Sequence, residues 1–414
     1  MESDCKTQIV ELLRRSVGSV FPGAVVLINA GGETVVHQAF GRLGPAETDP
    51  EVTCDTIFDV ASLTKVMATG PAVLMLHERG LLSIDRPLST YVPQFDGPLK
   101  SEVTLRHLLA HSAGLRGWAP LYLFANDSAG ILRLLHEVPL MHAPGETVEY
   151  SCLGFILLGK LVEQSTGETL GSFATKEIFE PLGMMSTQFN PASDLRDRIA
   201  PTEDRNLFER ELASSFLAEI RDAGSAEAEF WLRRSKAEEE RFRAFISEPT
   251  ADEELDVSRW PFRRDYLIRG EVHDTNAYRL RGVSGNAGIF STASDVAKFA
   301  EAFLAALKGR SGTTLLSRAT AREMVKRQGP LEGKQRGLGW KLVACENDGP
   351  ATAMSEGSFG HDGFTGCSLW IDPERELIVV LLSNAICPRY RPEAIGSLRR
   401  GLHNLAVEMV DSHH

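Results

Sequence analysis

No stretch of the sequence comes near the roughly 18 consecutive apolar residues of a membrane-spanning helix, so we expect no membrane span. The first residues, from Met1 to Lys6, are polar and mildly acidic, and no positively charged start leads into an apolar segment. A secretory signal needs both features. We therefore expect a cytoplasmic protein that does not act at a membrane.

Runs of lysine and arginine are also missing. The 414 residues carry 44 basic and 56 acidic side chains, and the formal net charge is −12. A protein that binds nucleic acid normally presents a basic face that neutralises phosphates. We therefore expect no nucleic acid among the partners.

Cysteine is scarce and scattered, with no Cys-x-x-Cys pair and no histidine at metal-binding spacing. This pattern favours reduced thiols over a disulfide framework. His107 and His111 are four residues apart on a predicted helix, but no third ligand is evident, so we favour a structural role and expect no metal. The six cysteines are Cys5, Cys54, Cys152, Cys345, Cys367 and Cys387.

The composition, with 43% hydrophobic and 24% charged residues, indicates a globular protein of two closely packed domains. Apolar patterning predicts strands near both ends of the chain and helices between them. The first and last strands must then share one sheet, which predicts an α/β (α+β) fold: an antiparallel sheet flanked by helices, with an inserted all-helical domain. We assign residues 1–60 and 282–414 to the sheet domain, 61–202 to the helical domain and 263–281 to a return segment.

Residues 203–262 differ from their surroundings, because they are dense in glutamate, arginine and alanine. Their apolar positions predict two amphipathic helices separated near Gly224, followed by an acidic loop through residues 248–256. A solvated insertion, a lid over a catalytic site and a surface for homo-oligomerisation all fit this pattern. The apolar positions that would form the lid or the surface include Phe216, Phe230, Trp231, Phe242, Phe245 and Ile246.

The segment 58–65 reads F-D-V-A-S-L-T-K and places Ser62 and Lys65 three residues apart at the start of a helix. Side chains at this spacing share one face, about 5–6 Å apart at Cβ. The helix N-terminus favours negative charge near the serine oxygen. A buried lysine with a lowered pKa can take the serine proton or keep a neighbouring base anionic. Alone, the pair also fits a capping serine beside a surface lysine.

Two further segments carry candidate chemistry. Tyr150 opens an apolar helix, where a loop could deliver it into a cleft and a nearby ammonium would lower its phenol pKa. Residues 360–364 read G-H-D-G-F and lead into a strand; glycines there let a substrate backbone approach, and a strand amide can stabilise an oxyanion. Taken alone, the first segment also fits a tyrosine in the core, and the second fits a histidine in a turn.

In this order and spacing, the three motifs resemble those of the serine β-lactamase and penicillin-binding-protein superfamily. The likeness is to the branch that holds class C β-lactamases, D-alanyl-D-alanine carboxypeptidases and family VIII carboxylesterases. It covers nearly the whole chain outside the insertion and implies a β-lactamase/transpeptidase-like fold. The supporting segments are 104–115 (TLRHLLAHSAGL), 154–160, 181–184 (PLGM), 269–277 (RGEVHDTNA), 288–295 and 360–373 (GHDGFTGCSLWIDP).

The resemblance also implies roles for individual residues. Ser62 would attack the substrate carbonyl and become acylated, while Lys65 and Tyr150 share general-base and general-acid duty. The backbone amides of Ser62 and Phe364 would form the oxyanion hole. The strand that carries His361 and Gly363 would line the acyl site. Such serine chemistry needs no cofactor.

Two positions depart from the family pattern. The middle motif is usually Tyr-x-Asn, and here its third residue is Cys152, whose thiol hydrogen-bonds a substrate amide poorly. His361 stands where many β-lactamases carry lysine, which removes a fixed positive charge. Both departures favour esters, because an ester needs less protonation of its leaving group than an amide does.

We therefore predict a carboxylesterase or acyltransferase of small to medium acyl groups, with a small-molecule ester or amide as substrate. The alternatives are a β-lactamase or D,D-carboxypeptidase activity on the same residues, or a non-catalytic scaffold whose insertion is an interface.

Trp118 and Tyr122 either wall the acyl pocket or pack in the core, and Cys152 is either a reactive or a buried inert thiol. His273 and Asp274 are a candidate hydrogen-bonded pair at the cleft rim.

Overall fold

The computed structural model describes residues 2–239, 241, 243, 264–310, 312, 315–329, 336–343, 352–388 and 392–412. Cys345, Phe242, Phe245, Ile246 and the acidic loop 248–256 lie outside these residues. In the described part, no helix is both long and apolar enough to cross a bilayer.

The main sheet has six antiparallel strands in the order β2-β1-β9-β8-β7-β6, and the first and last parts of the chain meet in it. Ala24 of β1 lies opposite Ser383 of β9, so the prediction that both ends of the chain share one sheet is confirmed. The strands are β1 (Gly23–Ala30), β2 (Glu33–Gly41), β6 (Lys341–Leu342), β7 (Phe359–Asp362), β8 (Ser368–Asp372) and β9 (Leu377–Ser383). A second sheet joins β3 (Phe58–Asp59), β5 (Ile289–Ser291) and β4 (Gln188–Phe189).

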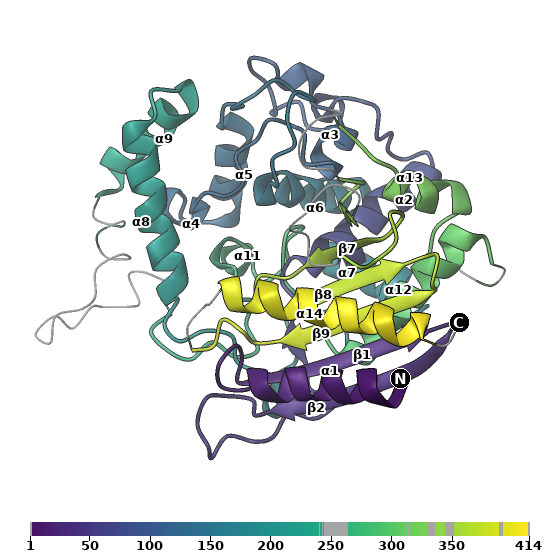
Figure 1. Ribbon diagram of the computed structural model, residues 1–414. Coiled ribbons are helices and arrows are strands. Elements are labelled where there is room, and N and C mark those ends of the chain that lie inside the picture. Colours follow the sequence, from purple (N-terminus) through teal and green to yellow (C-terminus); the bar gives the residue numbers. More distant parts are fainter. Residues whose placement is uncertain are drawn as a thin grey trace, which may run out of the picture.

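Strand β1 is buried on both faces because its side chains alternate between two apolar layers. Val25 and Leu27 face the main core beneath α12 (Ala293–Lys308). Val26 and Ile28 face a second core under α1 (Glu2–Ser16) and α14 (Pro392–Asp411). Figure 1 shows α14 and α1 lying side by side over this face of the sheet. The sheet is therefore flanked by helices, as predicted.

The helical part of the fold surrounds α6 (Cys152–Thr166), whose apolar residues are buried nearly all round. The first catalytic motif continues as a π-helix, η1 (Lys65–Thr69), which passes directly into α2 (Gly70–Glu78). Pro71 sits in the first turn of α2, at its junction with η1. The other helices here are α3 (Leu105–Leu109), α4 (Leu121–Phe124), α5 (Ser128–Glu137) and α7 (Leu170–Ala174). Short 3-10 or π turns are η2 (Leu88–Thr90), η3 (Lys100–Glu102), η4 (Thr175–Phe179) and η5 (Ser193–Arg198).

The charged segment contributes α8 (Leu207–Asp222) and α9 (Ala226–Ala237), which lie on either side of Gly224 and pack against each other. Phe216 and Trp231 are buried, and both rings contact Phe124 of the helical part. Arg116 forms hydrogen-bonded ion pairs with Glu219 and Glu227. Phe216 and Trp231 are therefore packed into the body of the protein and are not exposed at its surface. The remaining described helices are α11 (Thr275–Arg279) and α13 (Arg318–Val325).

Candidate active site

Ser62 lies on a tight turn between β3 and η1. Ala61, directly before it, has a positive φ of 47°, which is uncommon for a residue with a Cβ atom. The Asp59 carboxylate accepts a hydrogen bond from the Ala61 N–H at 2.8 Å, and the Thr64 hydroxyl donates to the Ala61 carbonyl at 2.7 Å. These two bonds hold the strained turn, and the half-buried Ser62 is placed at the start of the helix.

An amine from the same helical turn and a phenol from a distant part of the chain meet at the Ser62 hydroxyl. The Lys65 Nζ lies 3.0 Å from the Ser62 Oγ, and the Tyr150 hydroxyl lies 2.7 Å from the same atom. Lys65 is fully buried, and its ammonium also donates to the Asn286 carbonyl at 2.9 Å. The arrangement has the hydrogen-bond distances that proton transfer to or from a serine requires.

The pKa shifts of Lys65 and Tyr150 differ from the lowered values that the sequence argument expected. Burial lowers the pKa of Lys65, but its electrostatic interactions with Cys152 and Tyr150 outweigh this effect, so the pKa is raised rather than lowered. Burial raises the pKa of Tyr150, although Lys65 lowers it as the sequence argument assumed. At neutral pH the resting pair is therefore an ammonium and a neutral phenol. Because the two groups interact, they titrate as one unit.

The loop that carries Tyr150 is fixed by the segment 111–117. The Ser151 N–H donates to the His111 Nδ1 at 3.0 Å, and the Ser151 hydroxyl donates to the Arg116 carbonyl at 2.7 Å. A Cβ on Gly117 would lie 2.9 Å from the Tyr150 carbonyl, so only glycine fits this approach without a shift. These contacts place the phenol at Ser62.

The two histidines considered as a metal pair have structural partners. His107 accepts a hydrogen bond from the Thr104 N–H and so completes the cap of α3. The ring of His111 lies 4.7 Å from that of Tyr150, and burial keeps the pKa of His111 well below its ordinary value. No cluster of three or more metal-ligating side chains occurs among the described residues.

The third motif reaches Ser62 through close backbone packing. A Cβ on Gly363 would lie 2.6 Å from the Val60 carbonyl, and the Thr365 hydroxyl donates to the Asp59 carbonyl at 2.7 Å. Gly363 and the half-buried Phe364 therefore follow the end of β7 along the Ser62 turn. This position suits an amide that would stabilise charge on a substrate bound at Ser62.

His361 is buried, and its ring lies 5.7 Å from that of Tyr150. The His361 Nδ1 is 2.8 Å from the Asp362 carbonyl, so this nitrogen carries the proton in the neutral ring. Burial, together with Arg336, keeps the pKa of His361 well below its ordinary value. His361 is therefore neutral at physiological pH, in agreement with the loss of charge argued from the sequence.

Arg336 brings a guanidinium close to Tyr150. Its guanidinium is 5.1 Å from the centroid of the Tyr150 ring, and the residue is buried. A buried cation therefore lies beside the phenol although position 361 carries no lysine. Arg336 belongs to no motif, and its proximity to Tyr150 results from tertiary packing alone.

Cys152 begins α6, and its sulfur lies 3.6 Å from the Lys65 Nζ. Burial raises the pKa of this thiol, so it is protonated at neutral pH and favours the inert interpretation. The five cysteines in the described part of the chain are all free. Where the family pattern has an asparagine amide, this site therefore presents an uncharged thiol.

Tyr122 and Trp118 belong to one apolar cluster with Leu123 and with Ala213 of α8. Tyr122 is completely buried there, which supports core packing over a role in the pocket wall. Trp118 is only partly buried at the edge of the same cluster. The prediction that Trp118 contacts substrate stays a prediction.

The suggested pair of His273 and Asp274 is not formed. Instead, the His273 Nε2 lies 2.7 Å from a carboxylate oxygen of Glu203. Asp274 caps α11 and accepts a hydrogen bond from the Asn286 amide at 3.2 Å. Glu203 was missed because it lies 70 residues from its partner and in no recognisable motif.

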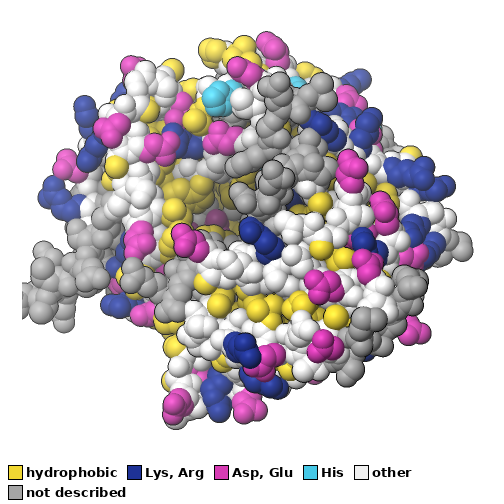
Figure 2. Space-filling view, viewed as in Figure 1, with side chains coloured by type: hydrophobic (Ala, Val, Ile, Leu, Met, Phe, Trp, Pro, Cys, Tyr) yellow, Lys and Arg dark blue, Asp and Glu magenta, His cyan; other side chains and the backbone are white. Residues whose placement is uncertain are grey.

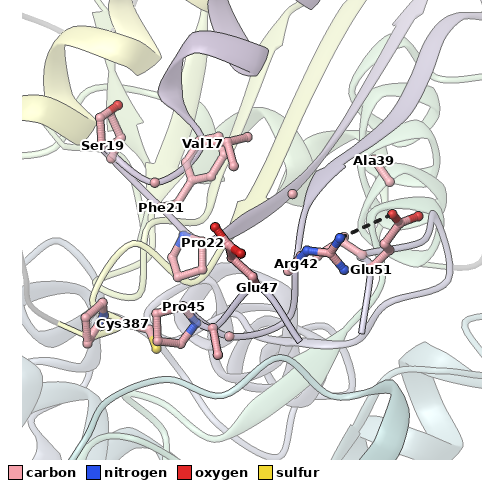
Figure 3. A pocket seen from close by; sticks show the side chains of 17 residues that line it. Val17, Ser19, Phe21, Pro22, Ala39, Arg42, Pro45, Glu47, Glu51 and Cys387 are labelled. Atoms are coloured by element: carbon pink, nitrogen blue, oxygen red, sulfur yellow. Dashed lines mark ion pairs between the residues drawn. The ribbon is translucent and has the colours of Figure 1, made fainter. Parts of the chain in front are cut away.

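The surface is hollowed at several places. Figure 2 shows one beside α8, with hydrophobic side chains on the wall formed by that helix. A separate concavity of about 580 Å³ lies between the segment after α1 and the end of β2 (Figure 3). Its lining includes Phe21, Cys387 and the Arg42–Glu51 ion pair, but not Ser62, Lys65 or Tyr150.

Comparisons with known proteins agree with this geometry. A sequence model of the Beta-lactamase family matches residues 9–394. The "Putative D-alanyl-D-alanine carboxypeptidase" of Escherichia coli (strain K12) is 28% identical over 401 residues, which cover 91% of this chain and 81% of that protein. The N-acetylmuramyl-L-alanine amidase of Bacillus subtilis (strain 168) is 26% identical over 406 residues, with 91% and 80% covered.

Solved structures share the fold at lower sequence identity. EstCE1, a hydrolase with promiscuous acyltransferase activity, superposes with a TM-score of 0.67 at 22% identity, over 97% of this chain and 99% of that chain. A class C beta-lactamase superposes with a TM-score of 0.65 at 17% identity, over 97% and 96%. The chain belongs to the beta-lactamase family, within the superfamily of serine hydrolases that also holds the penicillin-binding proteins.

Proposed function

We propose that this protein is a carboxylesterase or acyltransferase that forms an acyl-enzyme on Ser62 and prefers small to medium acyl esters. The observation that carries the proposal is the contact of one serine oxygen with both a buried ammonium and a phenol, Lys65 and Tyr150. A scaffold would need neither contact. Retention of the complete set therefore supports catalysis.

In the proposed acylation step, the Ser62 Oγ attacks the ester carbonyl carbon, and its proton passes to the Lys65–Tyr150 pair. Since the resting pair holds both of its protons, one must leave before the pair can accept that of Ser62. The carbonyl oxygen becomes negatively charged, and the amides of Ser62 and Phe364 would stabilise it.

Collapse of this intermediate breaks the bond to the alcohol oxygen. The Tyr150 hydroxyl is placed to return the proton to that oxygen, because it already lies at hydrogen-bond distance from Ser62. Water or a second alcohol then attacks the acyl group, and the same pair takes the proton of the attacking molecule. The two acceptors give hydrolysis and acyl transfer, respectively.

The preference for esters follows from Cys152. A protonated thiol offers a peptide-like substrate much weaker hydrogen bonding than an asparagine amide would. An ester loses less from this change, since it has no side-chain amide to satisfy. The fold is compatible with such chemistry, because EstCE1, whose description names hydrolase and acyltransferase activities, adopts it.

Turnover of p-nitrophenyl acetate and butyrate tests the proposal. The wild-type protein should release p-nitrophenol well above a Ser62→Ala control, and added alcohol should divert acyl groups into a new ester if transfer occurs. Rates equal to those of Ser62→Ala would reject an esterase.

A D,D-carboxypeptidase or β-lactamase activity is the second candidate. Arg336 favours it, because a guanidinium beside Tyr150 could hold the carboxylate of a peptide or penicillin. The name of the Escherichia coli relative points the same way. Release of D-alanine from a peptide ending in D-Ala-D-Ala, nitrocefin turnover or labelling of Ser62 by a fluorescent penicillin would support it over the esterase. A protein that hydrolyses esters but shows none of these three activities would reject this second candidate.

A further inference from the structure

Glu203, at the start of the charged segment, is a buried carboxylate close to the proposed active site. Glu203 and His273 are 1% and 5% exposed, and a Glu203 oxygen lies 2.7 Å from the His273 Nε2. The other oxygen of Glu203 accepts a hydrogen bond from the Phe208 N–H at 2.5 Å, in the first turn of α8. One side chain therefore fixes both His273 and Phe208.

The backbone of His273 is tied to the Ser62 turn. Its N–H donates to one oxygen of the Asp59 carboxylate at 2.8 Å. The other oxygen of Asp59 accepts from the Ala61 N–H, also at 2.8 Å, and Ala61 is the residue with positive φ directly before Ser62. A shift of His273 would therefore be transmitted to the turn that presents the nucleophile.

The side chain of His273 contacts the other half of the expected oxyanion hole. Its ring stacks on the ring of Phe364, with the centroids 5.5 Å apart and an angle of 21° between the planes. The ring of Phe208 also contacts Phe364, with the centroids 5.0 Å apart. Two aromatic neighbours of Phe364, His273 and Phe208, are thus held by the same carboxylate, that of Glu203.

We propose that Glu203 and His273 act as a positioning pair, which keeps the Phe364 amide aligned with the Ser62 amide. The pair does not touch the reacting atoms; it acts through Asp59 and through the stack on Phe364. The inference rests on the proposed function, because it assumes that these two amides receive the substrate oxygen. It also gives the segment after residue 203 a role in catalysis.

Replacing Glu203 tests the pair. Glu203→Met keeps the volume but removes both acceptors, and we expect kcat for p-nitrophenyl butyrate to fall about 10- to 100-fold with little change in KM, because misplacement by about 1 Å costs this much. Affinity for phenylboronic acid, whose tetrahedral serine adduct places an oxygen in the oxyanion hole, should fall by a similar factor. Glu203→Gln, which can still accept from Phe208 and donate to a neutral His273, should recover most of both losses.

Asp372→Asn is a matched control, because Asp372 is a buried, ion-paired carboxylate at the start of the hairpin turn between β8 and β9. It should lower the thermal midpoint without changing kcat. If Glu203→Met does not fold, His273→Gln removes the stacked ring and should give the same losses.

Wild-type-like kcat and boronic acid affinity in folded Glu203→Met, or in His273→Gln, would overturn the inference while leaving the proposed function intact. If the wild-type protein binds phenylboronic acid but hydrolyses no ester, the affinities of the variants still decide for or against the pair. A wild-type protein that neither hydrolyses the ester nor binds the boronic acid rejects the proposed function and the inference together.

Discussion

The Cβ position of Gly363 faces the carbonyl oxygen of Val60 at 2.6 Å, so the third motif and the nucleophile turn meet backbone to backbone. This contact brings the loop of Phe364 to Ser62 without a side chain between them. A methyl group at residue 363 cannot be accommodated unless one of the two segments moves.

Gly363→Ala should therefore damage catalysis more than folding. We expect kcat for p-nitrophenyl butyrate to fall by about 10²- to 10³-fold, which is the usual cost of losing one oxyanion donor. Gly396→Ala in α14 is the matched control, because a Cβ at that position meets no atom within 4 Å. Equal activity of the two variants would show that the approach of Gly363 to Val60 does not matter for the site.

The pH dependence of activity should reflect the Lys65–Tyr150 pair. The pKa values of both groups are raised, so the form that has lost one proton, which acts as the base, is scarce at neutral pH and accumulates as pH rises. The kcat/KM for p-nitrophenyl acetate, corrected for spontaneous hydrolysis, should therefore increase from pH 7 into the alkaline range. A profile that is already flat above pH 6 would contradict these protonation states.

Replacing Cys152 by asparagine should restore part of the amide recognition. A new hydrogen bond to a substrate amide contributes about 1 kcal/mol, or roughly fivefold in kcat/KM for acyl-D-Ala-D-Ala peptides. Hydrolysis of p-nitrophenyl acetate, which has no such amide, should change much less. The variant Cys152→Ala removes the sulfur without adding an amide, so its rates show which part of the change is due to the lost thiol alone. The explanation of the ester preference fails if the Asn variant loses peptide and ester activity in parallel.

Arg116 should be a strong contributor to stability. Its guanidinium forms two hydrogen bonds, of 2.7 and 2.9 Å, with Glu227, which is 1% exposed, and a third with Glu219. Arg116→Met leaves the Glu227 carboxylate buried without its main partner, and we expect a loss of about 3–5 kcal/mol in the free energy of unfolding. Urea denaturation measures this loss. The double variant with Glu227→Gln should be more stable than Arg116→Met alone, and a loss below about 1 kcal/mol would mean that α8 and α9 are held by apolar packing.

The sheet and the three motifs could be predicted because each leaves a local pattern. Apolar runs marked β1 and β9, and the spacing of Ser62 and Lys65 fixes their common face within one helical turn. The family resemblance predicted that these residues meet Tyr150, and the observed distance agrees with that prediction.

The rest of the site depends on contacts between segments that share no local signal. Arg336 and Glu203 reach Tyr150 and His273 only through the tertiary fold. The net direction of the pKa shifts at Lys65 and Tyr150 could not be predicted either, because it depends on the balance between burial and mutual attraction. The cytoplasmic location and self-association through the insertion stay predictions.

The most direct test of the account is to locate the covalent intermediate. The protein would be treated with a fluorophosphonate and with a slowly hydrolysed p-nitrophenyl ester, and then analysed by intact-mass and peptide mass spectrometry. We predict one adduct per chain, on the Ser62 oxygen, and none in Ser62→Ala. An unlabelled protein, or an adduct on another residue such as Cys152, would contradict the assignment of Ser62 as the nucleophile.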